Sequence, residues 1–173
     1  MIQVYCGEGK GKTTAALGQL LRMSGWGKEC VFCQFMKGND TGELHSLALL
    51  PGVRILRSGK NFGFYSSMSE EEKKELTEIH NRLLAELLAI QEEGKAAMIV
   101  LDEITYPVKY NLIDQERLRL FLKRAGEKNG QEIILTGREP ADFLVECADY
   151  ITEMKCIRHP YQKNIAARKG IEY

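Results

Sequence analysis

A glycine-rich segment near the start of the chain constrains its fold more than any other feature. Residues 6–14 read Cys-Gly-Glu-Gly-Lys-Gly-Lys-Thr-Thr. A run typical of a buried strand, residues 2–5, precedes this segment, and a run typical of a helix, residues 15–22, follows it. A strand, a glycine-rich turn and a helix in this order are the context in which a P-loop binds phosphate. The sequence therefore predicts a nucleotide-binding α/β fold.

The residue types in this loop fit phosphate binding. Glycines let backbone N–H groups turn inward around phosphate oxygens, and the amino end of the following helix adds attraction. We expect Lys12 to place its charge on the phosphates and the Thr13 hydroxyl to bind Mg²⁺. Cys6 stands where the usual pattern has glycine, and the alternative is an ordinary strand–helix turn. The other candidate nucleotide-binding residues of the loop are Gly7, Glu8, Gly9, Lys10, Gly11 and Thr14.

Two adjacent acids provide a second signal. Residues 96–101 form a continuous apolar run, as expected of a parallel strand covered on both faces, and Asp102 and Glu103 follow it. A strand end of this kind places a carboxylate beside the P-loop, where it can hold Mg²⁺ directly or through water. We therefore predict Thr13, Asp102 and Glu103 as metal-binding residues. The alternative is a pair of solvated acids at a strand end.

Strand-like and helix-like segments alternate along the chain. A capping-box pattern at Ser69 and Glu72 opens a long amphipathic helix that Gly94 ends. This alternation predicts a mostly parallel, doubly wound sheet in one domain, residues 1–173, with ligands at the carboxyl ends of the strands. The predicted strands are residues 2–5, 30–35, 53–56, 97–101, 131–136 and 150–154, and the further predicted helices are residues 114–124 and 140–147.

Composition narrows the possible functions. The 24 basic residues balance 24 acidic ones, so bulk charge does not predict nucleic-acid binding. No apolar run reaches transmembrane length, and the chain opens with a strand rather than a signal peptide. Five scattered cysteines fit a reducing cytoplasm. Cys30 and Cys33 lie three apart on a predicted strand and should point to opposite faces as buried residues rather than form a metal site.

Other strand ends carry further candidates. Lys37 and Arg138 each follow a predicted strand, and both could face the phosphates or be solvated surface cations. His159 precedes a proline and is interpreted as a loop residue rather than a base. Nothing stands out as a positioned general base, which an ATP-dependent hydroxyl kinase would need.

Residues 57–67 are polar and loop-like, yet Phe62, Phe64 and Tyr65 fall within four positions. Such aromatic side chains can form a platform for a large flat ligand, or they can plug a neighbouring apolar surface. The residues alone leave both possibilities open.

Together and in order, these motifs resemble the P-loop ATP:corrinoid adenosyltransferases nearly from end to end. The resemblance implies a RecA-like P-loop domain, a homodimer, a flavoprotein reductant, and transfer of the 5′-deoxyadenosyl group of ATP to Co(I) of a corrinoid with release of triphosphate. The alternatives are a RecA-like nucleoside kinase and a non-enzymatic ATP-binding regulatory module. The matching motifs are residues 7–16, 34–38, 42–43, 100–106, 135–138, 148–154, 159–160 and 169–173.

The resemblance also assigns roles. Co(I) is itself the nucleophile and carries no proton, so no base is required. Lys12, the loop amides and Mg²⁺ bound through Thr13 would stabilise the leaving triphosphate, and ATP in this family is thought to lie reversed in the P-loop. Phe62 and Phe64 best match an aromatic pair that lies under the corrin and helps to remove the lower ligand of Co(II), although the family often has Trp at the second position. Lys12, Thr13, Phe62 and Phe64 are thus the predicted catalytic residues.

Two differences from the family pattern stand out. Many members carry an N-terminal extension before the first strand that helps to cover the site, whereas this sequence opens at the strand. The tail at residues 163–168 also departs from the family pattern.

Overall fold

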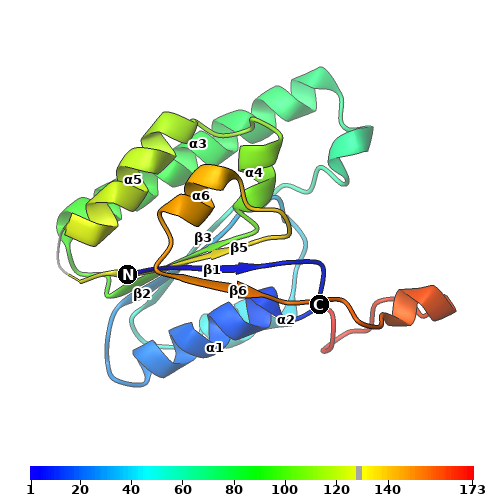
Figure 1. Ribbon diagram of the computed structural model, residues 1–173, viewed down its shortest axis with the longest axis horizontal. Coiled ribbons are helices and arrows are strands. Elements are labelled where there is room, and N and C mark those ends of the chain that lie inside the picture. The colour runs from blue at the N-terminus through cyan, green and yellow to red at the C-terminus, as the bar shows by residue number, and fades with distance from the viewer. Residues whose placement is uncertain (128–129) are drawn as a thin grey trace.

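Six parallel strands form one sheet in the computed structural model, which describes residues 1–127 and 130–173 (Figure 1). The strand order is β3-β2-β4-β5-β1-β6, and each neighbouring pair runs parallel. The carboxyl ends of all six strands therefore lie along the same end of the sheet. The strands are β1 (Ile2–Cys6), β2 (Cys30–Gln34), β3 (Val53–Arg57), β4 (Met98–Asp102), β5 (Glu132–Thr136) and β6 (Tyr150–Glu153).

Helices cover both faces of this sheet, which confirms the predicted doubly wound α/β arrangement of a RecA-like P-loop domain. Helices α1 and α2 lie on one face, and α3, α4, α5 and α6 lie on the other (Figure 1). Each helix among the described residues is too short or too polar to span a bilayer. The helices are α1 (Lys12–Ser24), α2 (Gly42–Leu47), α3 (Glu70–Glu93), α4 (Thr105–Lys109), α5 (Gln115–Glu127) and α6 (Asp142–Glu146), with 3₁₀ helices η1 (Tyr65–Ser67) and η2 (Pro160–Lys163).

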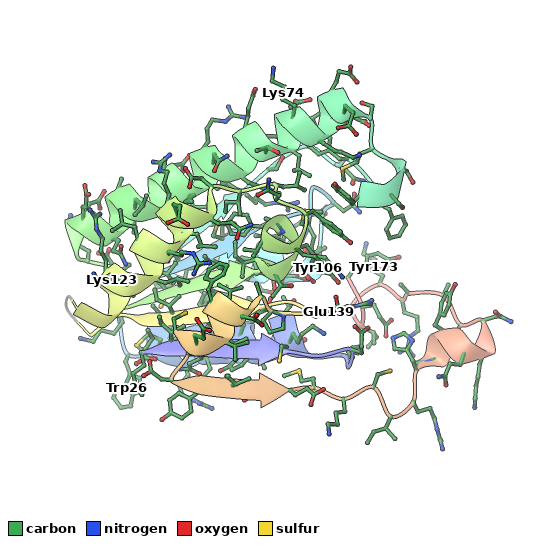
Figure 2. All side chains as sticks on the ribbon, turned by 45° about the horizontal axis from the view of Figure 1, so that its top comes forward. Trp26, Lys74, Tyr106, Lys123, Glu139 and Tyr173 are labelled. Carbon is green, nitrogen blue, oxygen red and sulfur yellow. The ribbon has the colours of Figure 1, made fainter. Side chains whose placement is uncertain are left out.

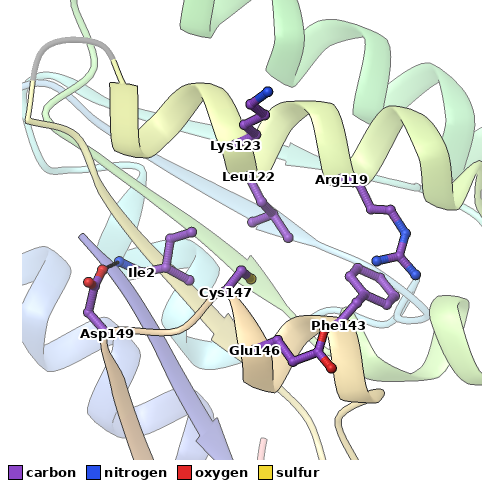
Figure 3. Close-up of a pocket in the computed structure, with 8 residues that line it drawn as sticks. All are labelled: Ile2, Arg119, Leu122, Lys123, Phe143, Glu146, Cys147 and Asp149. Atoms are coloured by element: carbon purple, nitrogen blue, oxygen red, sulfur yellow. Dashed lines mark hydrogen bonds between the residues drawn. The ribbon is translucent and has the colours of Figure 1, made fainter.

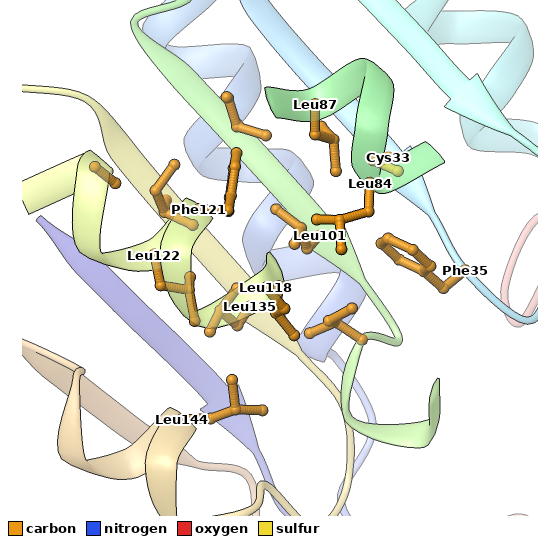
Figure 4. Close-up of a cluster of buried hydrophobic side chains, with 14 of the residues drawn as sticks. Cys33, Phe35, Leu84, Leu87, Leu101, Leu118, Phe121, Leu122, Leu135 and Leu144 are labelled. Carbon is orange, nitrogen blue, oxygen red and sulfur yellow. The ribbon is translucent and has the colours of Figure 1, made fainter. Parts of the chain in front are cut away.

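Two apolar clusters, one on each face of the sheet, form most of the core, and a small third cluster lies around Met68, Leu76 and Leu112. The larger cluster packs Leu84 of α3, Leu118 of α5 and Leu144 of α6 against strand residues such as Leu101 (Figure 4). The smaller cluster packs α1 and α2 against the opposite face. Strands β1, β2, β4 and β5 are buried by both layers over most of their length, whereas the edge strands β3 and β6 are more exposed. This burial explains why apolar runs predicted the central strands.

The two strand cysteines lie on opposite faces, as predicted. Cys33 belongs to the larger cluster and Cys30 to the smaller one, and both are free thiols. Burial raises the pKa of the Cys30 thiol to about 11 and also raises the pKa of Cys33. Both side chains therefore behave as small apolar residues of the core.

The capping box of α3 forms as predicted. The Ser69 hydroxyl accepts from the Glu72 backbone N–H at 3.2 Å, and the Glu72 carboxylate accepts from the Ser69 N–H at 2.8 Å. Gly94 ends the helix in the left-handed conformation, with φ of 70°. Helices α2 and α4 were not predicted, because segments of six and five residues are too short to show helical periodicity.

Candidate active site

The P-loop joins β1 to α1 and is pressed against the chain that follows β6. Gly9 N–H donates to the Met154 carbonyl at 2.6 Å, and Gly7 N–H donates to the Arg138 carbonyl at 2.9 Å. A β-carbon on Gly7 or on Gly9 would lie 2.6 Å from the Met154 oxygen, so both positions require glycine. Gly11 has φ of 112° and turns the chain into α1. Helix α1 consequently begins at Lys12, earlier than the predicted residue 15.

The two loop lysines lie in different places. Lys12 Nζ donates to the Gly7 and Gly9 carbonyls at 2.7 Å each, so its ammonium lies across the loop. Burial lowers the pKa of Lys12, and Glu103 partly offsets this. Lys10 Nζ instead reaches the C-terminal tail, 3.0 Å from a Glu172 carboxylate oxygen. Of the two lysines, Lys12 is therefore the one that places a positive charge inside the loop.

Asp102 is fully buried at the end of β4 and gathers polar groups from neighbouring elements. The Thr13 hydroxyl donates to Asp102 Oδ1 at 2.7 Å, which brings the predicted P-loop and strand-end residues together. A buried carboxylate requires such partners to offset its lost hydration. Its further partners are Thr136 at 2.7 Å, Lys37 at 3.2 Å and Gln34 at 3.3 Å.

Thr136 and Gln34 were missed by the sequence interpretation. Gln34 is paired with Asp102 across β2 and β4, and Thr136 ends β5. Each is the polar last residue of an otherwise apolar strand. This pattern, combined with the strand order, would have identified Gln34 and Thr136 as partners of Asp102. Thr136 Oγ1 also accepts from the Glu103 N–H at 2.9 Å, which fixes the turn after β4.

Glu103 and Lys37 form an ion pair at the same end of the sheet. Lys37 Nζ lies 3.4 Å from Glu103 Oε1. Burial raises the pKa of Glu103, while the nearby Lys37 ammonium lowers it. Burial lowers the pKa of Lys37, but Asp102 and Glu103 outweigh this effect and raise it above the ordinary value. Lys37 thus remains charged and holds two carboxylates close to the P-loop.

A cavity of about 340 Å³ lies at the carboxyl ends of the strands, where Lys12, Thr13, Lys37 and Glu103 line it. We call it the phosphate pocket. Figure 2 labels Tyr106 of α4, which lines it, and Tyr173 at the end of the tail. Predicted residues Lys37, Glu103 and Arg138 line this pocket with the P-loop. His159 also lines it and precedes η2, where its Nδ1 accepts from the Tyr161 N–H at 3.1 Å, consistent with a loop residue.

Comparison with known proteins identifies the family. The model of the family described as ATP:corrinoid adenosyltransferase BtuR/CobO/CobP matches residues 1–173. The chain belongs to this adenosyltransferase family. It is 30% identical over 182 residues to a corrinoid adenosyltransferase of Sinorhizobium sp, covering all of this chain and 80% of that relative. It is also 30% identical to corrinoid adenosyltransferases of Escherichia coli K12 and Salmonella typhimurium, over 176 and 181 residues and 85% of each relative.

ATP and a corrinoid are therefore the substrates of this adenosyltransferase family member. The oxygen groups of Thr13, Asp102 and Glu103 fit Mg²⁺, a hard cation that prefers carboxylates, hydroxyls and phosphate oxygens. Thr13 lines the phosphate pocket, and its 2.7 Å contact with Asp102 places that fully buried carboxylate directly behind it, although Asp102 is not one of the residues that line the pocket.

A polar segment beside the phosphate pocket carries the predicted aromatic pair. We call residues 58–64 the aromatic loop. A β-carbon on Gly38, one residue after Lys37, would lie 2.1 Å from the Lys60 carbonyl, so the loop lies directly against the segment that follows β2. Phe62 is half-buried against apolar clusters, whereas Phe64 is 84% exposed. The burial of Phe62 fits the interpretation of a plug against an apolar surface, and the exposure of Phe64 leaves its ring open to contact.

A larger hollow lies away from this site. It has a volume of about 510 Å³ and lies between α5 and α6 (Figure 3). The Arg119 guanidinium lies 3.8 Å from the Phe143 ring centroid, and the Asp149 carboxylate accepts from the Ile2 N–H at 2.7 Å. None of the predicted site residues lines this hollow.

Proposed function

We propose that the phosphate pocket binds the triphosphate of ATP and that the aromatic loop presents a corrinoid to the ribose. Co(I) would attack the 5′ carbon with its electron pair, so that a Co–C bond forms as the C5′–O bond breaks. Inorganic triphosphate would leave with the electrons of that bond. The observation that carries this proposal is the 2.7 Å contact between Thr13 and Asp102, because it joins the P-loop to the acids of β4.

Lys12 and the loop amides would stabilise the negative charge that grows on the departing triphosphate. Preorganised charges of this kind act strongly because they need little rearrangement as the reaction proceeds. The position of Lys12 Nζ across the loop, 2.7 Å from two loop carbonyls, supports this role. Arg138 lines the same pocket and pairs with Glu8 at 3.2 Å, and we propose that phosphate oxygens attract its guanidinium.

Thr13 and Asp102 would hold Mg²⁺, with Glu103 bound directly or through water. When bound, this ion supplies charge neutralisation on the triphosphate oxygens. Lys37 would hold the two carboxylates close together, as its contacts of 3.2 and 3.4 Å indicate.

The exposed ring of Phe64 would lie against the corrin, while the half-buried Phe62 anchors the loop. The 84% exposure of Phe64 supports this assignment, since a ring with so little contact in the free protein gains apolar contact from a flat ligand. Excluding water and the lower ligand would make Co(II) easier to reduce.

A homodimer, a cytoplasmic location and a flavoprotein that supplies the reducing electron remain predictions from the family resemblance. The balanced charge supports a protein that does not depend on nucleic acid.

The direct test supplies ATP, Mg²⁺ and a chemically reduced corrinoid and follows the visible spectrum. We expect a Co–C bond to form only with the protein present, and Thr13→Ala to slow its formation. Phosphate transfer from ATP to a nucleoside, without a Co–C bond, would instead identify a nucleoside kinase. ATP binding with neither product would identify a regulatory module.

A further inference from the structure

Three tyrosine rings form a stack between the phosphate pocket and the aromatic loop. The rings of Tyr65 and Tyr110 are parallel within 5°, with centroids 4.0 Å apart. The rings of Tyr110 and Tyr106 follow at 6.2 Å and 26°. Tyr106 lines the phosphate pocket, and Tyr65 directly follows the exposed Phe64 in the chain. The stack therefore connects the two halves of the proposed site.

One end of the stack is fixed to the acids of β4. Helix α4 begins at Thr105, two residues after Glu103, and carries Tyr106. The Tyr110 N–H donates to the Tyr106 carbonyl at 2.9 Å, so both rings belong to the same helical turn. The turn from which this helix starts is held by the Thr136 hydroxyl, which accepts from the Glu103 N–H at 2.9 Å. The tyrosines are thus joined by a short, fixed segment to the carboxylates.

The other end of the stack supports the aromatic loop. The Lys73 ammonium lies 5.0 Å from the centroid of the Tyr65 ring, which stacks on Tyr110. Tyr65 and Tyr110 pack with Phe62 against a small apolar cluster that is separate from the main core. The Ser67 N–H donates to the Phe64 carbonyl at 2.9 Å and joins Phe64 to η1. Tyr65 is therefore the nearest ring on the chain that can fix the backbone of Phe64.

We infer that Tyr65 and Tyr110 are positioning residues that hold Phe64 in place relative to the P-loop. This inference rests on the proposed function. The lower ligand of a Co(II) corrin that contacts Phe64 is then excluded only when this ring is in place, so the stack acts on the reduction of Co(II) rather than on the attack by Co(I).

The test compares variants that keep or remove the stacked ring. Tyr110→Phe and Tyr65→Phe keep it, whereas Tyr110→Leu keeps apolar volume without an aromatic face. We expect both Phe variants to match the wild type. Tyr110→Leu, Tyr110→Ala and Tyr65→Ala should lose about tenfold or more of the turnover that starts from Co(II) with a mild reductant. Turnover from prepared Co(I) should change much less, and ATP affinity should be unchanged.

A spectroscopic readout separates positioning from simple loss of stability. With ATP bound, the fraction of Co(II) corrinoid that has lost its lower ligand should fall in Tyr110→Leu and stay high in Tyr110→Phe. Tyr150→Ala, on the edge strand β6, is the matched control and should behave as the wild type.

Two outcomes overturn the inference in different ways. If the wild type forms the Co–C bond and Tyr110→Leu matches it in the Co(II) assay and spectrum, the stack has no positioning role. If the wild type forms no Co–C bond even from Co(I), the proposed function fails, and the inference fails with it.

Discussion

Asp102 contributes both to the stability of the sheet and to the proposed metal site. It is fully buried and contacts Thr13, Thr136, Gln34 and Lys37. Removing it would leave several polar groups without their acceptor, which costs stability as well as activity. Lys12 and Glu103 are better probes of the chemistry, because fewer structural contacts depend on their side chains.

Replacing Lys12 with Ala should reduce turnover about a hundredfold or more, because it removes a charge aimed at the leaving triphosphate. Lys28→Ala provides the control, since Lys28 is an exposed lysine between α1 and β2 that does not line the phosphate pocket. We expect the control to retain most activity in the Co(I) assay. Equal losses in the two variants would show that the loop interior is not the phosphate site.

The dependence of turnover on Mg²⁺ concentration should distinguish Thr13→Ala and Glu103→Ala from Lys12→Ala. Thr13→Ala and Glu103→Ala remove oxygen groups that we assign to Mg²⁺, so they should raise the metal concentration needed for half-maximal rate. Part of their lost activity should return at high Mg²⁺, whereas Lys12→Ala should not recover. A magnesium titration of all three variants measures this, and identical curves would argue against the assigned metal ligands.

Helix α3 is the element that ties the sheet to the aromatic side of the site. Its His80 is 1% exposed, lies 3.1 Å from the Leu112 carbonyl through Nδ1, and accepts from the Met36 N–H at 3.4 Å through Nε2. Burial lowers the pKa of this imidazole to about 4. The neutral ring therefore holds Met36, a non-glycine residue with φ of 60°, directly before Lys37.

This histidine gives the folded protein a pH-dependent stability. Between about pH 6.5 and pH 4 the unfolded chain binds a proton at His80 that the folded protein does not, so the free energy of unfolding falls as the pH is lowered. The loss reaches up to about 3 kcal/mol and stops below pH 4, where both states are protonated. Urea unfolding across this range should show a steeper decline for the wild type than for His80→Gln. Parallel declines would contradict the burial argument.

The aromatic loop is the second element whose role can be tested directly. Phe64→Ala should impair turnover that starts from Co(II) with a mild reductant, because the lower ligand is no longer excluded. Turnover from Co(I) and ATP affinity should change little, since the phosphates are held elsewhere. Comparing the two assays measures the effect. Equal losses in both assays would return these rings to the interpretation of a surface plug.

Across the whole molecule, local patterns predicted most elements but not how they meet. Apolar runs located the central strands, and the P-loop and Asp102 were found because their chemistry needs fixed residue types at strand ends. Thr136 and Gln34 were missed because their contact with Asp102 depends on strand order, which long-range pairing decides. Helical periodicity could show that α3 buries one face, but not that His80 contacts Met36 and Leu112.

Local patterns also did not predict the contacts of the chain after β6, residues 154–173. The Met154 backbone contacts the P-loop, and Glu172 contacts Lys10, although both residues lie far from the loop in sequence. Such contacts appear only when β6 is placed beside β1 at the edge of the sheet.

The proposed adenosyl transfer is tested most directly by counting the products of one reaction. Wild-type protein, ATP, Mg²⁺ and prepared Co(I) corrinoid are mixed, the Co–C bond is quantified by visible absorbance, and the phosphorus products are quantified by NMR. We predict one intact inorganic triphosphate for each adenosylated corrinoid. Formation of ADP with a phosphorylated acceptor, or a Co–C bond without released triphosphate, would contradict it.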